Sequence, residues 1–269
     1  MYKLLSSDLD LTMIDDTFTL PEINIGAVAK AHDAGCLVVI NSGRAPSSIL
    51  PYEEKLGLVK EGCYGIAFNG SRVYETVSRK PIWDVRLGND LAMEILGIIS
   101  QEGECGIAYV GDDMYILKQN SEWVAGYLNK ASHPYTEVEN FDEIEDSISK
   151  VLVAARQEAL TPLHGKIDDI SRGRFNSVRT APILLEFMSP EASKGNALRF
   201  LAEYLGISQQ ETIAIGDFFN DISALMYAGL PVAVANATSE LKELARYITL
   251  KNCMEGAFAE VVDKFVLGT

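Results

Sequence analysis

Short apolar runs of strand length recur in both end regions of the chain, and segments with helical periodicity separate them. The runs lie at residues 3–8, 36–40, 64–68, 212–215 and 232–234. A run without polar alternation is typical of a strand that is covered on both faces, as in a parallel sheet. A helical pattern that Pro21 opens and Gly35 closes joins the first two runs. Because strand–helix–strand connections form parallel pairs with right-handed crossovers, the two end regions predict an α/β fold with a parallel sheet.

The middle of the chain has a different pattern, in which helix-like segments alternate with strand-like ones. The helix-like segments lie at about 88–102, 121–131 and 157–170, and the strand-like ones near 105–110, 113–118, 150–155, 173–179 and 183–188. Units of this kind predict an α+β module with an antiparallel sheet. The module contains no compact cluster of catalytic residue types. We therefore expect an inserted domain at 84–186 within a core formed by 1–83 and 187–269.

The composition excludes several classes of partner. The 269 residues carry a formal net charge of −15, and the sequence pI is about 4.6. Such an acidic protein repels nucleic-acid phosphates and anionic membrane surfaces, so we expect neither as a partner. The four cysteines have no CxxC spacing, which is typical of buried thiols in a reducing compartment. With no apolar stretch of signal-peptide or membrane-spanning length, we expect a cytoplasmic protein, either a monomer or a homodimer.

Two carboxylates and a hydroxyl follow the first apolar run, as Asp8, Asp10 and Thr12. In an extended segment residues two apart point to the same side, so Asp8 and Asp10 should face one way. Two carboxylates about 4 Å apart repel by roughly 4 kcal/mol at an effective dielectric of 20. The pair therefore needs a cation or a shared proton. For an isolated pair of carboxylates, a solvated acidic turn is the more ordinary interpretation. Whether this pair is functional therefore depends on the residues at the other strand ends.

Small and polar residues also follow the second and third apolar runs. Ser42 and Gly43 lie between a strand end and a helix start, where free backbone N–H groups and the helix dipole favour an anion. A helix cap with a turn glycine is the alternative. Asn69-Gly70 follows the third run, and there a hairpin turn is the favoured interpretation.

The later half of the chain adds a lysine and further carboxylates. Lys194 lies in the first turn of a helix that Ser193 caps, where its charge opposes the dipole preference, although a surface lysine is an equal alternative. Asp217 and Asp221 follow the run at 212–215, and a helix cap at Asn220 or Asp221 is the alternative there. Ligand sites in open α/β sheets lie at the carboxyl ends of the strands, so these groups should converge. Carboxylates without nearby His or Cys describe a hard-cation site, which Mg²⁺ fits best.

These motifs together resemble those of the haloacid-dehalogenase superfamily, in its Cof-type group of phosphatases with a large α+β cap (class IIB). The first family motif, DxDxT, appears as Asp8 to Thr12, and the second, Ser or Thr before Gly-Arg, as Ser42 to Arg44. The third is Lys194, and the fourth is Gly216-Asp217 with Asn220-Asp221. Asn69-Gly70 and residues 232–236 also match the family. The resemblance spans the whole chain and implies a Rossmann-like core with an inserted cap.

The resemblance implies a two-step phosphoryl transfer that depends on Mg²⁺. Asp8 would be the nucleophile that forms an aspartyl-phosphate, and Asp10 would act as general acid and then as general base. The metal would be held by the Asp8 carboxylate, the Asp10 backbone carbonyl and Asp217, with support from Asp221. The residues implied to bind the phosphate or to orient the lysine are Leu9, Thr12, Ser42, Gly43, Lys194 and Asn220. The cap would close over the site and select the leaving group.

The sequence departs from the family pattern at two places. Leu11 stands where many members have glycine, and Phe218-Phe219 is bulkier than usual in the fourth motif. Neither departure removes a reacting group, but both affect the expected shape of the pocket floor.

Several functions fit these motifs. The expected substrate is a small phosphate ester, a sugar phosphate first and a phosphorylated cofactor of the FMN or PLP type second. A sugar phosphomutase is the nearest alternative in chemistry. A phosphoacceptor signalling module uses similar groups, but such modules are much shorter and have no cap. A non-catalytic binding protein is disfavoured because every reacting group is present.

Overall fold

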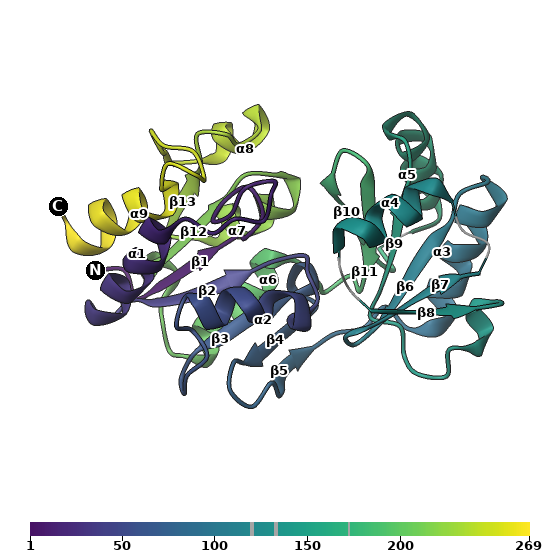
Figure 1. Cartoon of the computed structure of the whole chain (residues 1–269), viewed down its shortest axis with the longest axis horizontal. Coiled ribbons are helices and arrows are strands. Elements are labelled where there is room, and N and C mark those ends of the chain that lie inside the picture. Colours follow the sequence, from purple (N-terminus) through teal and green to yellow (C-terminus); the bar gives the residue numbers. More distant parts are fainter. Residues whose placement is uncertain (119–120, 132–133, 172) are drawn as a thin grey trace. The chain divides into compact units, whose positions relative to one another are not determined.

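The structure, a computed structural model, describes residues 1–118, 121–131, 134–171 and 173–269. The chain forms two compact units (Figure 1). The core unit consists of Met1–Asp84 and Ser193–Thr269, and the inserted unit of Val85–Ala192. The chain thus returns to the core unit at Ser193 and not at residue 187. The physical reason is that β11 (Leu184–Met188) hydrogen bonds to β9 (Lys150–Ala154), which belongs to the inserted unit.

An eight-stranded sheet forms the centre of the core unit, in the order β14-β13-β12-β1-β2-β3-β4-β5. The strands from β14 to β3 run parallel, and β4 and β5 are antiparallel additions at one edge. This arrangement confirms the predicted α/β fold with a parallel sheet. The strands are β1 (Leu4–Ser7), β2 (Leu37–Asn41), β3 (Tyr64–Ala67), β4 (Arg72–Glu75), β5 (Pro81–Asp84), β12 (Thr212–Gly216), β13 (Leu230–Ala233) and β14 (Tyr247–Ile248).

Helices cover the core sheet, with α1 packing against α9 and α6 packing against α7 (Figure 1). The helices are α1 (Glu22–Asp33), α2 (Pro46–Lys55), α6 (Lys194–Tyr204), α7 (Ile222–Tyr227), α8 (Ser239–Leu244) and α9 (Ala257–Val261), which a π-helical turn (Val262–Leu267) extends. Short 3₁₀ turns lie at Phe68–Gly70, Gln209–Glu211 and Phe219–Asp221. The buried strands β1 and β12 lie at the middle of the sheet, which explains their uninterrupted apolar runs.

The buried face of α1 differs from the one that the apolar pattern predicts. The apolar positions Ile25, Val28, Ala29 and His32 recur at helical spacing in the sequence. Of these only Val28 is buried, and the other buried residues of the helix are Asn24, Ala27 and Ala31. A hydrogen bond explains the inclusion of a polar residue, since the Asn24 Nδ2 donates to the Met13 carbonyl at 2.9 Å. Hydrophobicity alone does not register such a contact.

The inserted unit has a six-stranded sheet in the order β10-β11-β9-β6-β7-β8, and α3 and α5 pack on one face of it. Its strands besides β9 and β11 are β6 (Gly106–Val110), β7 (Asp113–Leu117), β8 (Tyr135–Val138) and β10 (Asn176–Ala181), and its helices are α3 (Asn89–Gln101), α4 (Glu122–Ala131) and α5 (Gln157–Ser171). The expected antiparallel sheet is wrong for one pair, because β8 runs parallel to β7. The apolar pattern missed β8 because three of its four residues are exposed.

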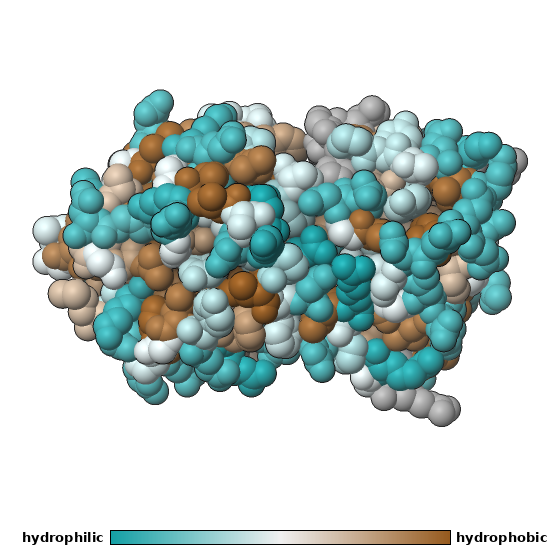
Figure 2. Space-filling view, turned by 90° about the horizontal axis from the view of Figure 1, so that it is seen from below, coloured by the Kyte–Doolittle hydropathy of each residue, from teal (hydrophilic) through white to brown (hydrophobic). Residues whose placement is uncertain are grey.

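The face drawn in Figure 2 carries hydrophilic side chains with hydrophobic ones interspersed. Among the described residues, every helix is too short or too polar to cross a membrane.

Candidate active site

Asp8 stands at the carboxyl edge of the core sheet, directly after β1. The Asp8 N–H donates to the Ile215 carbonyl of β12 at 2.9 Å, and Ser7 pairs with Ile40 of β2. The parallel registers thus bring the ends of β1, β2 and β12 to one edge, as the sequence predicts. Leu9 follows with a fully buried side chain, and its carbonyl accepts the backbone hydrogen bonds that close the next turn.

Lys194 is a buried bridge between two carboxylates, not a surface lysine. Its Nζ donates to Asp8 Oδ1 at 2.5 Å and to Asp221 Oδ1 at 2.6 Å, and only 1% of its side chain is exposed. Ser193 caps α6 as expected, because its Oγ accepts the Asn196 N–H at 3.0 Å. The helix therefore begins where its first side chain can reach the ends of two strands.

Asp217 and Asp221 complete the cluster from the loop after β12. The Asp221 Oδ2 accepts the N–H groups of Asp217 at 3.0 Å and Phe218 at 3.2 Å, so it also closes the 3₁₀ turn. A Cβ at Gly216 would lie 2.3 Å from the Asp221 Cγ, and only glycine fits there. The Asp217 Oδ1 accepts the Thr12 hydroxyl at 3.0 Å. Thr12 is fully buried, and the expected contact of its hydroxyl with a phosphate stays a prediction.

The three carboxylates outnumber the one lysine in a buried setting. Burial raises the pKa of Asp8 to about 7, against the opposing charge of Lys194. Burial and the neighbouring Asp8 carboxylate raise the pKa of Asp217 well above its usual value. Burial alone would lower the pKa of Lys194, but the carboxylates of Asp221 and Asp8 raise it above its usual value. The lysine therefore stays charged, and the carboxylates still need a further positive charge.

The donor set fits a hard divalent cation. Carboxylate oxygens of Asp8, Asp217 and Asp221 all lie within 4.8 Å of one another, and all three residues are buried. Oxygen ligands in this number suit Mg²⁺ or Ca²⁺ better than the softer transition metals. A bound cation would also offset the burial and the repulsion that raise the carboxylate pKa values.

Asp10 lies outside this group of three carboxylates. Its carboxylate accepts a bidentate pair of hydrogen bonds from Arg44, from Nε at 2.9 Å and from Nη2 at 2.5 Å. The guanidinium also stacks on the rings of Phe18 and Tyr52, at 4.9 and 5.3 Å from their centroids. The Asp10 side chain is 42% exposed, so solvent or a substrate can reach it.

The Ser42–Gly43 loop is fixed by Asn69. This residue lies in the hairpin turn between the antiparallel strands β3 and β4, so the predicted hairpin turn is confirmed. The Asn69 N–H donates to the Ser42 carbonyl at 3.0 Å, and the Asn69 side chain lies 3.0 Å from where a Gly43 Cβ would be. Asn220 Nδ2 donates to Asn69 Oδ1 at 3.0 Å. Asn69 is buried and has a left-handed φ of 53°. It therefore ties the second motif to the fourth.

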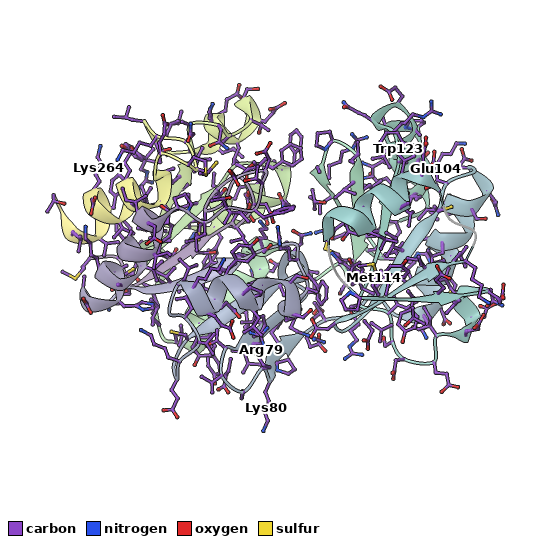
Figure 3. All side chains as sticks on the ribbon, in the orientation of Figure 1. Arg79, Lys80, Glu104, Met114, Trp123 and Lys264 are labelled. Atoms are coloured by element: carbon purple, nitrogen blue, oxygen red, sulfur yellow. The ribbon has the colours of Figure 1, made fainter. Side chains whose placement is uncertain are left out.

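The start of α2, just after this loop, is held by Arg79. Its Nη2 donates to the Pro46 carbonyl at 2.6 Å and its Nη1 to the buried Glu53 at 2.5 Å. The Tyr74 hydroxyl donates to the same carboxylate at 2.7 Å. Figure 3 shows that the next residue, Lys80, points away from the fold. Arg79 thus anchors the helix whose N-terminus faces the predicted anion loop.

Comparison with known proteins assigns the family. Residues 5–261 match the family described as haloacid dehalogenase-like hydrolase. The chain belongs to this family. The match confirms the predicted resemblance and the predicted class of enzyme, a phosphatase-type hydrolase of the Cof kind.

Several known proteins are similar to this haloacid dehalogenase-like hydrolase over nearly its whole length. "Putative phosphatase YxeH" of Bacillus subtilis is 30% identical over 269 residues, which is 99% of both chains. The 5-amino-6-(5-phospho-D-ribitylamino)uracil phosphatase YitU of the same organism is 24% identical, with 98% of both chains covered. A solved haloacid dehalogenase-like hydrolase from Bacteroides thetaiotaomicron has a TM-score of 0.87 at 25% identity, and 98% of this chain and 99% of that chain are covered. The subclass IIB sugar phosphatase BT4131 shares the fold, with a TM-score of 0.84, 21% identity and 98% coverage of both chains.

Three residues that contact the candidate site were not among the predicted site residues: Arg44, Asn69 and Asn236. Arg44 is part of the second motif, and Asn69 and Asn236 lie in the two other segments that match the family. Asn236 Nδ2 donates to the Leu11 carbonyl at 2.7 Å, and its Oδ1 accepts the Cys253 N–H at 3.1 Å. Nothing in the local sequence around Asn236 signals contacts with these distant residues.

Leu11 also explains the family preference for glycine at its position. Its φ is 56°, in the left-handed region that glycine adopts without steric cost. The Asn236 hydrogen bond to its carbonyl helps to hold this conformation.

Proposed function

We propose that the core unit hydrolyses phosphate monoesters of small metabolites through an aspartyl-phosphate on Asp8, with Mg²⁺ held at the carboxylate cluster. The observation that carries this proposal is the surplus of buried carboxylates around Lys194 at the carboxyl edge of the sheet. The roles proposed for the other site residues depend on this cluster.

Asp8 and Asp217 would hold the metal with their carboxylates and Asp10 with its backbone carbonyl. Asp221, whose oxygens already accept hydrogen bonds from Lys194 and the loop, would support the site. When bound, Mg²⁺ would neutralise negative charge on the carboxylates and on a substrate phosphate. Thr12 would orient Asp217 through the hydrogen bond that it donates.

In the first step the Asp8 carboxylate attacks phosphorus, and the bond from phosphorus to the ester oxygen breaks. Asp10 gives its proton to that leaving oxygen. Lys194 keeps Asp8 oriented throughout, because its other hydrogen bond to Asp221 fixes the ammonium. In the structure Arg44 pairs with the ionised Asp10 side chain, so this pair would have to separate before Asp10 carries the proton that it donates.

In the second step water attacks the phosphorus of the aspartyl-phosphate, and Asp10 accepts the proton of that water. The bond between Asp8 and phosphorus breaks, which releases inorganic phosphate and restores the carboxylate. The Leu9 and Gly43 amides, the Ser42 hydroxyl, Lys194 and Asn220 would hold the transferring phosphoryl group. Catalysis of this kind depends mainly on positioning and on charge neutralisation.

The inserted unit would act as the cap that selects the leaving group. A sugar phosphate is the first candidate substrate. A phosphorylated precursor or cofactor of the flavin type is the second, supported by the name of the relative YitU. The net charge of −15 supports small substrates over nucleic acid.

Release of inorganic phosphate from a panel of phosphorylated metabolites tests the function. The panel includes sugar phosphates, flavin-type and pyridoxal-type phosphates, and an aryl phosphate, each with Mg²⁺. We expect release from the aryl phosphate and a strong preference within one metabolite class. Asp8→Asn, purified in parallel, controls for contaminating phosphatases. A coupled isomerisation assay separates a phosphomutase, and the absence of phosphate release from every compound would refute the proposal.

A further inference from the structure

Asn41 is a buried polar residue that takes no part in the proposed chemical steps. It is the last residue of β2, immediately before Ser42, and only 1% of it is exposed. Its Nδ2 donates to the Ser6 Oγ of β1 and to the Lys194 carbonyl at the start of α6, both at 3.1 Å. One side chain therefore links the two central strands to the helix that carries the active-site lysine.

The hydrogen bonds fix how the amide of Asn41 is oriented. A backbone carbonyl can only accept, so the nitrogen of the amide must face Lys194. The Oδ1 is then left buried without a hydrogen-bond partner. An unsatisfied buried oxygen destabilises a fold, and an apolar side chain of the same size would avoid that cost. The retained amide therefore points to a role other than stability.

We propose that Asn41 is a positioning residue for Lys194 in the hydrolase reaction, and this inference rests on the proposed function. The bond to the Lys194 carbonyl fixes the first turn of α6 against β1 and β2. The first turn in turn sets where the Lys194 Nζ lies between Asp8 and Asp221. Without the bond, the first turn can shift, and an ammonium shared by two carboxylates loses its alignment with Asp8.

The test compares two variants that remove different hydrogen bonds of the same amide. Asn41→Leu keeps the volume of the side chain and removes both bonds. Ser6→Ala removes the acceptor on β1 and leaves the bond to Lys194 in place. Hydrolysis of an aryl phosphate with Mg²⁺ gives kcat and KM, and thermal unfolding gives Tm. If Asn41→Leu does not fold, Asn41→Ser replaces it, because its hydroxyl is too short to reach the Lys194 carbonyl.

We expect Asn41→Leu to lower kcat about ten-fold, the effect of losing roughly one hydrogen bond, with a smaller change in KM. Ser6→Ala should stay within about two-fold of the wild type. A purely structural role would instead lower Tm and leave kcat of the folded enzyme unchanged, which would overturn the inference. Equal losses of kcat in both variants would also overturn it. An inactive wild type would refute the proposed function, so the two failures are distinguishable.

Discussion

Each unit of the molecule buries a lysine, and the two lysines have different surroundings. In the inserted unit Lys150 pairs with Glu186 at 2.7 Å, one positive charge against one negative charge. The same carboxylate accepts the Thr180 hydroxyl at 3.1 Å, and the ammonium lies 4.8 Å from the Tyr109 ring centroid. In the core unit Lys194 faces three carboxylates.

The comparison shows that charge imbalance, and not burial of charge as such, marks the candidate active site. In a buried pair of one cation and one anion the two charges neutralise each other, so the pair can have a purely structural role. An excess of buried carboxylate is stable only with an added cation or a proton. This difference can be tested at both lysines. Removing a carboxylate partner of Lys194 should affect turnover, whereas breaking the Lys150–Glu186 pair should affect stability.

The largest expected effect is the loss of turnover in Asp8→Asn. An amide cannot form the aspartyl-phosphate, so kcat should fall by at least about 10⁴-fold. The fold should persist, because the substitution removes one of the surplus negative charges and leaves Lys194 paired with Asp221. Phosphate release and thermal unfolding measure the two effects. Near-native turnover would show that Asp8 is not the nucleophile.

Asp10→Asn should have an effect that depends on the leaving group. A sugar alkoxide needs a proton to leave, so the first step should slow by roughly 10²- to 10⁴-fold with a sugar phosphate. An activated phenolate needs none, so an aryl phosphate should give a burst of phenol and then stall as the aspartyl-phosphate. Rapid-quench kinetics with both substrates measures this difference. Equal slowing of the first step, or no burst, would mean that Asp10 is not the acid and base.

Substitutions in the buried ion pair of the inserted unit should change the stability of the fold and not the rate of the chemical step. Lys150→Met leaves Glu186 buried without its ion-pair partner, which should destabilise folding by about 3–5 kcal/mol. The double variant Lys150→Met/Glu186→Leu removes both charges and should recover most of that loss. Chemical denaturation measures both free energies. If the single variant unfolds like the wild type, burial of the Glu186 carboxylate does not depend on its pairing with Lys150.

The sequence predicted the parts of the fold that follow from local patterns. Continuous apolar runs identified the central strands, and the strand ends placed Asp8, Ser42 and Asp217 at one edge. The pattern failed where exposure removed the signal, as in β8. It also failed where a hydrogen bond buried a polar residue, as with Asn24 in α1.

The site was predictable in its residue types and less so in its contacts. The burial of Lys194 could not be inferred from its own segment, because it depends on where β1 and the loop after β12 lie. For the same reason the hydrogen bond from Thr12 to Asp217 and the pairing of Asp10 with Arg44 were not foreseen. Contacts between residues far apart in the chain are set by tertiary packing, which local periodicity does not encode.

We propose that the surplus carboxylates of the core unit hold a divalent cation that hydrolysis requires. The most direct measurement is aryl phosphate turnover in excess chelator and after addition of Mg²⁺ or Ca²⁺, with thermal unfolding of wild type and Asp217→Asn under the same conditions. We expect no turnover in chelator, recovery with Mg²⁺, and inhibition by Ca²⁺, whose looser coordination misplaces the nucleophile. Mg²⁺ should raise the Tm of the wild type and not that of Asp217→Asn. Full turnover in excess chelator would contradict the account.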